Sequence, residues 1–217
     1  LQNFFQVGMI ALIVIFQSDL RAALERFGST KIKDFRGISE SDAKAITNTA
    51  ETIAEAVDVL SKTKTGALIA IERSTKLGEH LLHGIIINAE MSTLLIRNIF
   101  FNKAPMHDGA MIIRDRRIYA AGCYLPLSNA DVNKDLGTRH RAALGLSEVS
   151  DAIVIIVSEE TGTISVAVDG ELKRDFTAVT LKAEIIKYLL PDDISRRSSG
   201  ERKIKGIKNH KGGADNE

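Results

Sequence analysis

The sequence predicts an α/β domain in which a central mixed β-sheet is flanked by helices. Two observations lead to this prediction. Short apolar runs bounded by turn residues alternate along the chain with longer segments whose apolar side chains recur every third or fourth position. Two pairs of the apolar runs are also separated only by short polar turns, which is typical of hairpins and therefore of antiparallel pairing. The sequence contains no evident internal repeat.

Four helices are expected in the domain, each with one apolar face. They cover residues 43–60, 92–101, 138–148 and 177–190. Ser39 or Ser41 can cap the first helix, because a serine hydroxyl accepts a hydrogen bond from a free N–H of the first turn. Thr138 stands where the N-cap of the third helix would stand, and Pro191 ends the fourth.

Six strands are expected between and beside these helices. They cover residues 66–73, 84–88, 110–113, 118–125, 152–158 and 163–168. The charged segment 114–117 forms the turn of one hairpin, and the segment 159–162 forms the turn of the other. The run 66–73 begins with an almost wholly apolar stretch, which predicts a buried strand.

The composition excludes several classes of protein. The 217 residues carry a net charge of +1, so no overall field attracts nucleic acid, and nucleic acid is not an expected partner. Tryptophan is absent and aromatic residues make up 5%, which disfavours a stacking platform for single strands. Cys123 is the only cysteine, so the chain has no intrachain disulfide, which fits a reducing cytosol.

The two ends of the chain differ in character from its centre. The chain starts at Leu1, and the apolar stretch Phe4–Phe16 falls short of the roughly 20 residues that span a membrane. We expect residues 1–16 to be the end of a transmembrane helix and 17–37 to be a linker. A buried core helix or an amphipathic dimer helix is the alternative. The folded domain is expected at 38–191. The basic tail 192–217 is expected to be disordered, with contact to anionic lipid as the alternative.

The segment Gly137–Arg141 is the most informative motif. Thr138 as N-cap would place Arg139 and Arg141 in the first helical turn, where the unpaired N–H groups already act as a partial positive charge. Two arginines and His140 therefore destabilise this helix end unless an anion binds there. A phosphate would be stabilised both by the N–H groups and by the guanidinium groups. A solvated basic face is the alternative.

A second polar cluster comes earlier in the chain. Asp108 follows a long loop and opens a strand, so its carboxylate can point into a cleft and hold a divalent cation or orient a hydroxyl. Gly109 would let a ligand approach the backbone closely. An ordinary Asp-Gly turn is the alternative. Glu160 and His107 could be further metal ligands, or the first could be solvated and the second could brace its loop.

Taken together, these segments resemble the diadenylate cyclase family. The matching segments are Gly66–Ile69, His107–Ala110, Cys123–Leu127, Gly137–Ala143 and Val157–Gly162. The resemblance extends from about residue 40 to about residue 190, and the apolar start is similar to the membrane-anchored, CdaA-type class. It implies that 38–191 is a diadenylate cyclase catalytic domain with the fold of that family.

The resemblance implies a nucleotidyltransferase that condenses two ATP molecules into cyclic di-3′,5′-AMP and two pyrophosphates. Asp108 and Gly109 would be catalytic, and Asp108, Glu160 and His107 would hold Mn²⁺, Mg²⁺ or Co²⁺. The residues implied in binding the triphosphate are Thr138, Arg139, His140, Arg141 and Ser158. Tyr124 and Leu125 would line the adenine pocket.

The implied partners follow from the same resemblance and from the symmetry of the product. Two domains must meet face to face, because one domain offers one phosphate site and the product has two-fold symmetry. The resemblance also implies a bacterial cell membrane location with a cytoplasmic catalytic domain, a YbbR-domain regulator and phosphoglucosamine mutase. The alternative function is a catalytically silent sensor that binds ATP or cyclic di-AMP. A membrane scaffold would not explain the arginines.

Overall fold

The structure of the chain is a computed structural model that describes residues 39–78, 83–129 and 137–190. Its elements, in chain order, are α3 (Glu40–Lys62), β1 (Ala67–Ile71), β2 (Ile85–Glu90), α4 (Thr93–Ile99), β3 (Ala110–Arg114), β4 (Arg117–Cys123), α5 (Thr138–Val149), β5 (Ile153–Val157), β6 (Ile164–Val168), β7 (Glu171–Phe176) and α6 (Ala178–Leu189). The predicted transmembrane helix, linker and tail lie outside the described residues.

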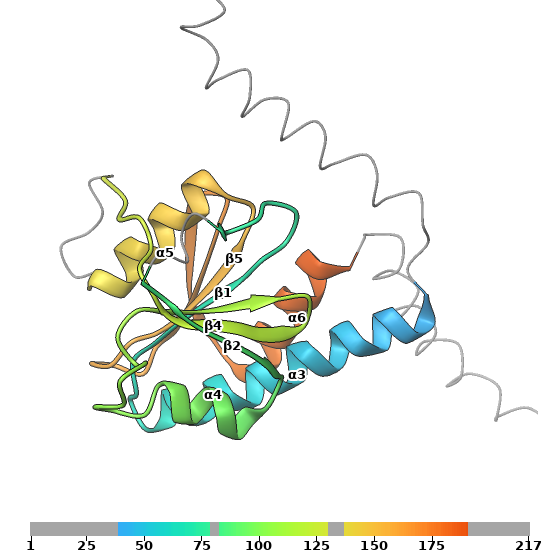
Figure 1. The fold of residues 1–217 in the computed structure, drawn as a ribbon, viewed down its shortest axis with the longest axis horizontal. Coiled ribbons are helices and arrows are strands. Elements are labelled where there is room, and N and C mark those ends of the chain that lie inside the picture. The colour runs from blue at the N-terminus through green and yellow to red at the C-terminus, as the bar shows by residue number, and fades with distance from the viewer. Residues whose placement is uncertain (1–38, 79–82, 130–136, 191–217) are drawn as a thin grey trace, which may run out of the picture. The chain divides into compact units, whose positions relative to one another are not determined.

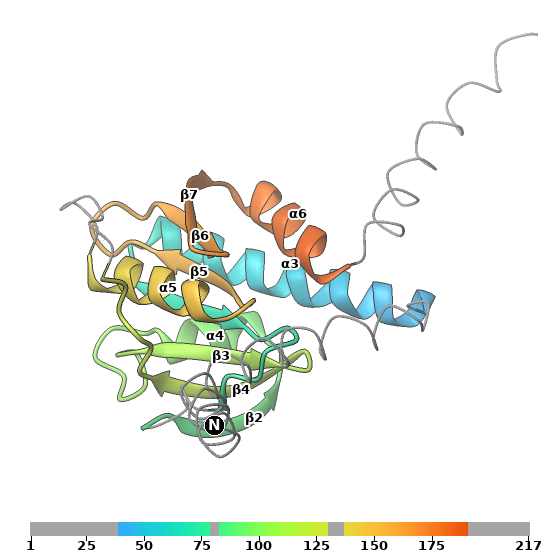
Figure 2. The same ribbon diagram turned by 90° about the horizontal axis from the view of Figure 1, so that it is seen from above.

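One seven-stranded sheet forms the centre of the domain, with the strand order β2-β4-β3-β1-β5-β6-β7 (Figures 1 and 2). Strands β1 and β3 pair in parallel, and all the other neighbouring strands pair antiparallel. The sheet is therefore mixed, which confirms the predicted fold class. The central strands β1 and β5 are buried at every position, because helices cover both faces of the sheet there.

Helices α3, α4 and α6 cover one face of the sheet, and α5 covers the other (Figures 1 and 2). Successive side chains of a strand point to opposite faces. In β1, Ile69 accordingly packs in the larger core beneath α3, and its neighbours Leu68 and Ala70 pack in the smaller core beneath α5. The helix start at Ser39 is confirmed, since its hydroxyl accepts a hydrogen bond from the N–H of Asp42 at 3.1 Å.

Strand β7 was not predicted from the sequence. It lies at the edge of the sheet, pairs only with β6, and carries four exposed charged residues. An edge strand needs little buried surface, so it lacks the apolar pattern on which the strand predictions depended. Strand β2 forms the opposite edge and has Ile85 and Ile86 exposed at 54% and 62%.

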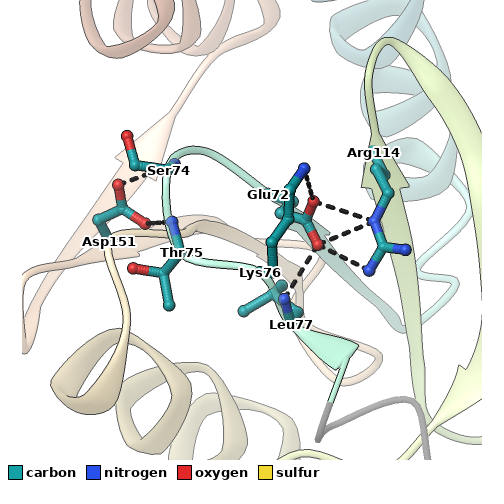
Figure 3. Close-up of polar contacts among 7 residues, drawn as sticks. All are labelled: Glu72, Ser74, Thr75, Lys76, Leu77, Arg114 and Asp151. Carbon is teal, nitrogen blue, oxygen red and sulfur yellow. Dashed lines mark hydrogen bonds and ion pairs between the residues drawn. The ribbon is translucent and has the colours of Figure 1, made fainter. Parts of the chain in front are cut away.

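A buried ionic network fixes the segment that follows β1 (Figure 3). The side chain of Glu72 is 1% exposed and accepts hydrogen bonds from Nε and Nη2 of Arg114, each with a shortest distance of 2.9 Å. Lys76 Nζ and the backbone N–H of Leu77 complete its set of donors, at 2.9 and 3.0 Å. Burial raises the pKa of Glu72, but these donors together outweigh burial and leave the pKa below its usual value.

The carboxylate of Asp151 fixes the middle of the same segment, at residues 74 and 75. It accepts hydrogen bonds from the backbone N–H groups of Ser74 and Thr75, at 3.0 and 2.9 Å (Figure 3). These contacts lie at the end of the sheet where β1 and β3 end. The predicted site segments lie at the opposite end, where both strands begin.

Candidate active site

The directions of the strands bring the predicted site segments to one end of the sheet. Gly66 precedes β1 and Asp108 precedes β3. Because these two strands are parallel, both residues lie at the end of the sheet where the strands begin. Strand β5 is antiparallel to β1, so Ser158, which follows β5, lies at the same end of the sheet. Strand β4 is antiparallel to β3, which brings Tyr124 there as well.

Gly109 sits where only a glycine fits. Its φ is +107°, and an added Cβ would lie 2.8 Å from the carbonyl oxygen of Cys123 and 2.9 Å from the carbonyl carbon of Gly122. The strand pair β3–β4 therefore closes tightly at the point where Asp108 enters. The side chain of Asp108 is exposed. The close approach that the structure gives Gly109 is to strand β4, and the approach of a ligand there stays a prediction.

The ring of His107 braces the loop before Asp108. Its Nδ1 lies 2.6 Å from the carbonyl oxygen of Ala104, and its backbone N–H donates to the same oxygen at 3.1 Å. A carbonyl oxygen can only accept, so Nδ1 is the donor in this contact, and in the neutral ring Nε2 then has the lone pair. This arrangement, in which one nitrogen is fixed by a carbonyl and the other is left as a ligand, is the one found around metal-binding histidines.

The N-cap of α5 is Gly137, not Thr138, which corrects the sequence prediction by one residue. Gly137 has the extended backbone of an N-cap, and its carbonyl oxygen accepts from the N–H of Arg141 at 3.3 Å. Among the described residues, no side chain caps the helix, and no acidic residue lies in its first turn. Thr138 and Arg139 take up the first two helical positions, so the arginines do lie at a helix N-terminus, where N–H groups have no partner within the helix.

Arg139 is tied to the hairpin turn that follows β5. Its Nη1 donates to Oε2 of Glu159 at 2.6 Å, and the two side chains are 21% and 64% exposed. Gly66 lies directly against this pair, since an added Cβ there would be 2.5 Å from Nη1. Sequence analysis considered the Glu159–Glu160 turn but chose Glu160 as the functional residue, and it did not assign a role to Gly66. Glu160 is exposed.

His140 differs from its two arginine neighbours because it points into the protein. Its exposed fraction is 6%, and among the described residues its Nε2 has no hydrogen-bond partner. Burial, followed by the positive charge of Arg174, lowers the pKa of His140 below its usual value. The ring is therefore neutral at pH 7, and its direct contact with phosphate stays a prediction. Arg141 is exposed, with Nη2 3.4 Å from the carbonyl oxygen of Ser128.

The predicted adenine residues Tyr124 and Leu125 follow directly after the end of β4. Tyr124 is 60% exposed, and its ring centroid lies 5.6 Å from that of His83 with a tilt of 47°. Leu125 is half-buried and packs against the smaller core. An exposed aromatic ring can stack on a base, so this geometry is compatible with the predicted pocket. Nothing in the sequence pattern indicated that His83 would meet Tyr124.

Ser158 is half-buried at the start of its turn, where its hydroxyl accepts from the N–H of Thr161 at 3.3 Å. The three predicted metal ligands do not form one cluster. Within the described ranges, no three histidine, cysteine, aspartate or glutamate side chains gather closely enough to hold an ion. His107 and Asp108 are neighbours with a suitable nitrogen and oxygen, and Glu160 does not join them in a group of three.

Comparison with known families now identifies the class of protein. Residues 54–172 match the DAC family, described as DisA bacterial checkpoint controller nucleotide-binding. Because the match covers more than half of the chain, the protein belongs to the DAC family, which confirms the predicted resemblance.

Named relatives narrow this class. The chain is 47% identical over 176 residues to cyclic di-AMP synthase CdaA of Bacillus subtilis, and the alignment covers 81% of the chain and 64% of that relative. It is 43% identical over 184 residues to the diadenylate cyclase of Listeria monocytogenes, with coverages of 84% and 67%. The chain thus spans about two thirds of the length of these curated relatives.

Solved structures agree with the fold. A double mutant of DacA from Staphylococcus aureus superimposes with a TM-score of 0.65 at 42% identity, covering 70% of this chain and 100% of that chain. A protein of Bacillus cereus, named a hypothetical membrane spanning protein, superimposes with a TM-score of 0.57 at 33% identity, with coverages of 81% and 88%. In the part of this chain that the structure describes, no helix is both long and apolar enough to cross a membrane.

Proposed function

We propose that the chain is the catalytic part of a diadenylate cyclase, which joins two ATP molecules into cyclic di-3′,5′-AMP and releases two pyrophosphates. The observation that carries the proposal is that two groups lie at the same end of the sheet. Arg139, in the first turn of α5, lies against Gly66, which precedes β1, and Asp108 precedes the neighbouring parallel strand β3. The arginine-bearing start of α5 can hold an anion, and Asp108 supplies a carboxylate at that end. The names of the curated relatives, a cyclic di-AMP synthase and a diadenylate cyclase, support this product.

In this proposal, each side chain acts on one part of ATP. Arg139, Arg141 and the first N–H groups of α5 hold the triphosphate and neutralise its charge, which grows on the pyrophosphate as it leaves. Asp108 accepts a hydrogen bond from the ribose 3′-hydroxyl and orients it for in-line attack on the α-phosphorus of the other ATP. Tyr124 and Leu125 contact the adenine.

A divalent metal belongs to the proposal, with Asp108 and His107 as its protein ligands. Their carboxylate oxygen and imidazole nitrogen suit Mn²⁺, Mg²⁺ or Co²⁺. Two donors from this chain are too few for a closed site, so phosphate oxygens of ATP would complete the set. Such an ion would supply charge neutralisation at the phosphates.

The symmetry of the product calls for a homodimer. Each 3′-oxygen attacks the α-phosphorus of the other nucleotide, whereas one domain provides one triphosphate site. Two domains therefore face each other through the same surface. Attachment to a bacterial membrane through residues 1–16 completes the proposal, supported by the name of the Bacillus cereus neighbour. The YbbR-domain regulator and phosphoglucosamine mutase stay predictions.

The test is incubation of the chain with ATP and Mn²⁺, followed by mass spectrometry at the mass of cyclic di-AMP. Asp108→Asn should lower the rate of product formation at least about a hundredfold, because the amide is a poor base and a poor metal ligand, while the affinity for ATP changes far less. Asp115→Asn is the matched control, since Asp115 lies in the β3–β4 turn at the opposite end of β3.

Two results would overturn the proposal. Equal turnover by Asp108→Asn and the unaltered chain would remove Asp108 from the mechanism. Tight ATP binding without any product would favour the silent sensor. A rate that rises faster than linearly with protein concentration is the expected signature of the dimer.

A further inference from the structure

We propose that Glu159 is a positioning residue, which holds the guanidinium of Arg139 so that its remaining N–H groups face the triphosphate. This inference rests on the proposed function, because it assumes that α5 binds the phosphates of a nucleotide. It assigns a role to the first glutamate of the turn after β5, whereas the family resemblance pointed to the second, Glu160.

The contact between the two side chains has the features of a built interaction. The distance of 2.6 Å between Nη1 and Oε2 is short even for a charge-assisted hydrogen bond. An ion pair between two exposed side chains would add little. Here, however, the side chain of Arg139 is only 21% exposed, and it projects from the rigid first turn of α5.

Gly66 supplies the surface on which the pair rests. An added Cβ at this position would lie 2.5 Å from Nη1 and 2.8 Å from Cζ of Arg139, and 3.0 Å from Oε2 of Glu159. The backbone before β1 therefore approaches the guanidinium as closely as a glycine permits. Three segments that are distant in the sequence thus define one orientation of Arg139.

That orientation leaves the phosphate-binding side of the guanidinium available. Arginine carries five N–H donors in a planar fork, and Glu159 engages only Nη1. Among the residues that the structure describes, Nε and Nη2 of Arg139 have no hydrogen-bond partner, and these two nitrogens form the edge that binds phosphate in a bidentate manner. A carboxylate that competed with phosphate would occupy this edge instead, so the geometry points to positioning.

The experiment measures affinity separately from turnover. The probe is 3′-deoxy-ATP with Mn²⁺, since a nucleotide without a 3′-hydroxyl cannot attack and its binding to the full chain can be titrated calorimetrically. Glu159→Ala should raise its Kd about tenfold, because the fork loses its fixed orientation. Glu159→Gln should stay within about threefold of the unaltered chain, because the amide oxygen accepts the same hydrogen bond.

Two further variants complete the design. Gly66→Ala should reproduce the loss of affinity with both charges still present, since its Cβ displaces the guanidinium. Glu51→Ala is the matched control, because Glu51 is 52% exposed and pairs at 3.2 Å with Lys182, which lies on α6. With ATP as substrate, the change in Glu159→Ala should appear in KM more than in kcat.

Three results would overturn the inference. They are unchanged or tighter binding by Glu159→Ala, a loss in Glu159→Gln as large as in Glu159→Ala, and unchanged binding by a folded Gly66→Ala. If the unaltered chain makes no cyclic di-AMP, the proposed cyclase activity fails. The titration with 3′-deoxy-ATP still tests the role of Glu159 in that case, so the two failures are distinguishable.

Discussion

Gly145 lies in the middle of α5 and packs against the backbone of the segment that follows the predicted adenine residues. An added Cβ would lie 2.3 Å from the carbonyl oxygen of Pro126, 2.6 Å from the nitrogen of Ser128 and 2.7 Å from the carbonyl carbon of Leu127. Ordinary contact begins at 3.4 Å, so all three distances are too short. The three atoms belong to the backbone, and no change of side-chain rotamer can relieve the overlap.

Gly145→Ala therefore sets two effects against each other. Replacing glycine by alanine within a helix stabilises it by about 1 kcal/mol. Overpacking costs about 1–3 kcal/mol, and the upper end applies because the backbone has to move. We expect a net loss of about 2 kcal/mol in the free energy of unfolding, which lowers Tm by about 4–8 °C in a domain of this size.

The same substitution should weaken nucleotide binding. The segment 126–128 continues directly from Tyr124 and Leu125, and hydrogen bonds of Ser128 join it to α5. Its N–H donates to the carbonyl oxygen of Arg141 at 3.0 Å, and its hydroxyl donates to Glu148 at 2.6 Å. Moving this segment away from α5 separates the adenine residues from the arginines, so the Kd for 3′-deoxy-ATP should rise about tenfold.

Thermal unfolding and calorimetric titration of the two variants Gly145→Ala and Gly78→Ala provide the assay. Gly78 is the matched control, because an added Cβ there meets no atom of the described residues within 4 Å. The reasoning is refuted if Gly145→Ala has the Tm of the unaltered chain or a higher one, since the gain in helix propensity would then exceed the cost of the overlap.

Two further predictions concern buried ionisable groups. Glu72→Gln should lower the free energy of unfolding by about 2–4 kcal/mol at pH 7, because the charge of Arg114 loses its partner. The pKa of Glu72 is lower in the folded chain than in the unfolded chain, so the stabilisation by its charge is lost as the pH falls through the folded-state pKa. Urea unfolding should therefore show the difference in stability between Glu72→Gln and the unaltered chain shrinking below about pH 4. His140→Gln should flatten the fall in stability from pH 7 to 5, because the folded chain holds the ring neutral while the unfolded chain takes up a proton below about pH 6.5. An unchanged slope in urea unfolding at a series of pH values would contradict the placement of His140.

Local pattern was sufficient for most of the elements. The buried strands were predicted correctly because their apolar runs are short and bounded by turns. Helix α3 was predicted correctly because its apolar spacing follows a serine cap. The pattern failed at β7, whose charged residues are tolerated only because the strand lies at the sheet edge. It also placed the N-cap of α5 at Thr138, since threonine is a common cap, whereas the backbone turns at Gly137.

By itself, the sequence determined the mixed α/β class and the membership of the diadenylate cyclase family, and it predicted an anion site at the start of α5. These conclusions depend on short stretches in which neighbouring residues act together. The tertiary structure alone decided which of two adjacent glutamates meets Arg139, that Gly66 lies against this pair, and that His140 points inward. The reason is physical. These contacts join segments that are far apart in the chain, and the directions of the strands bring the segments to one end of the sheet.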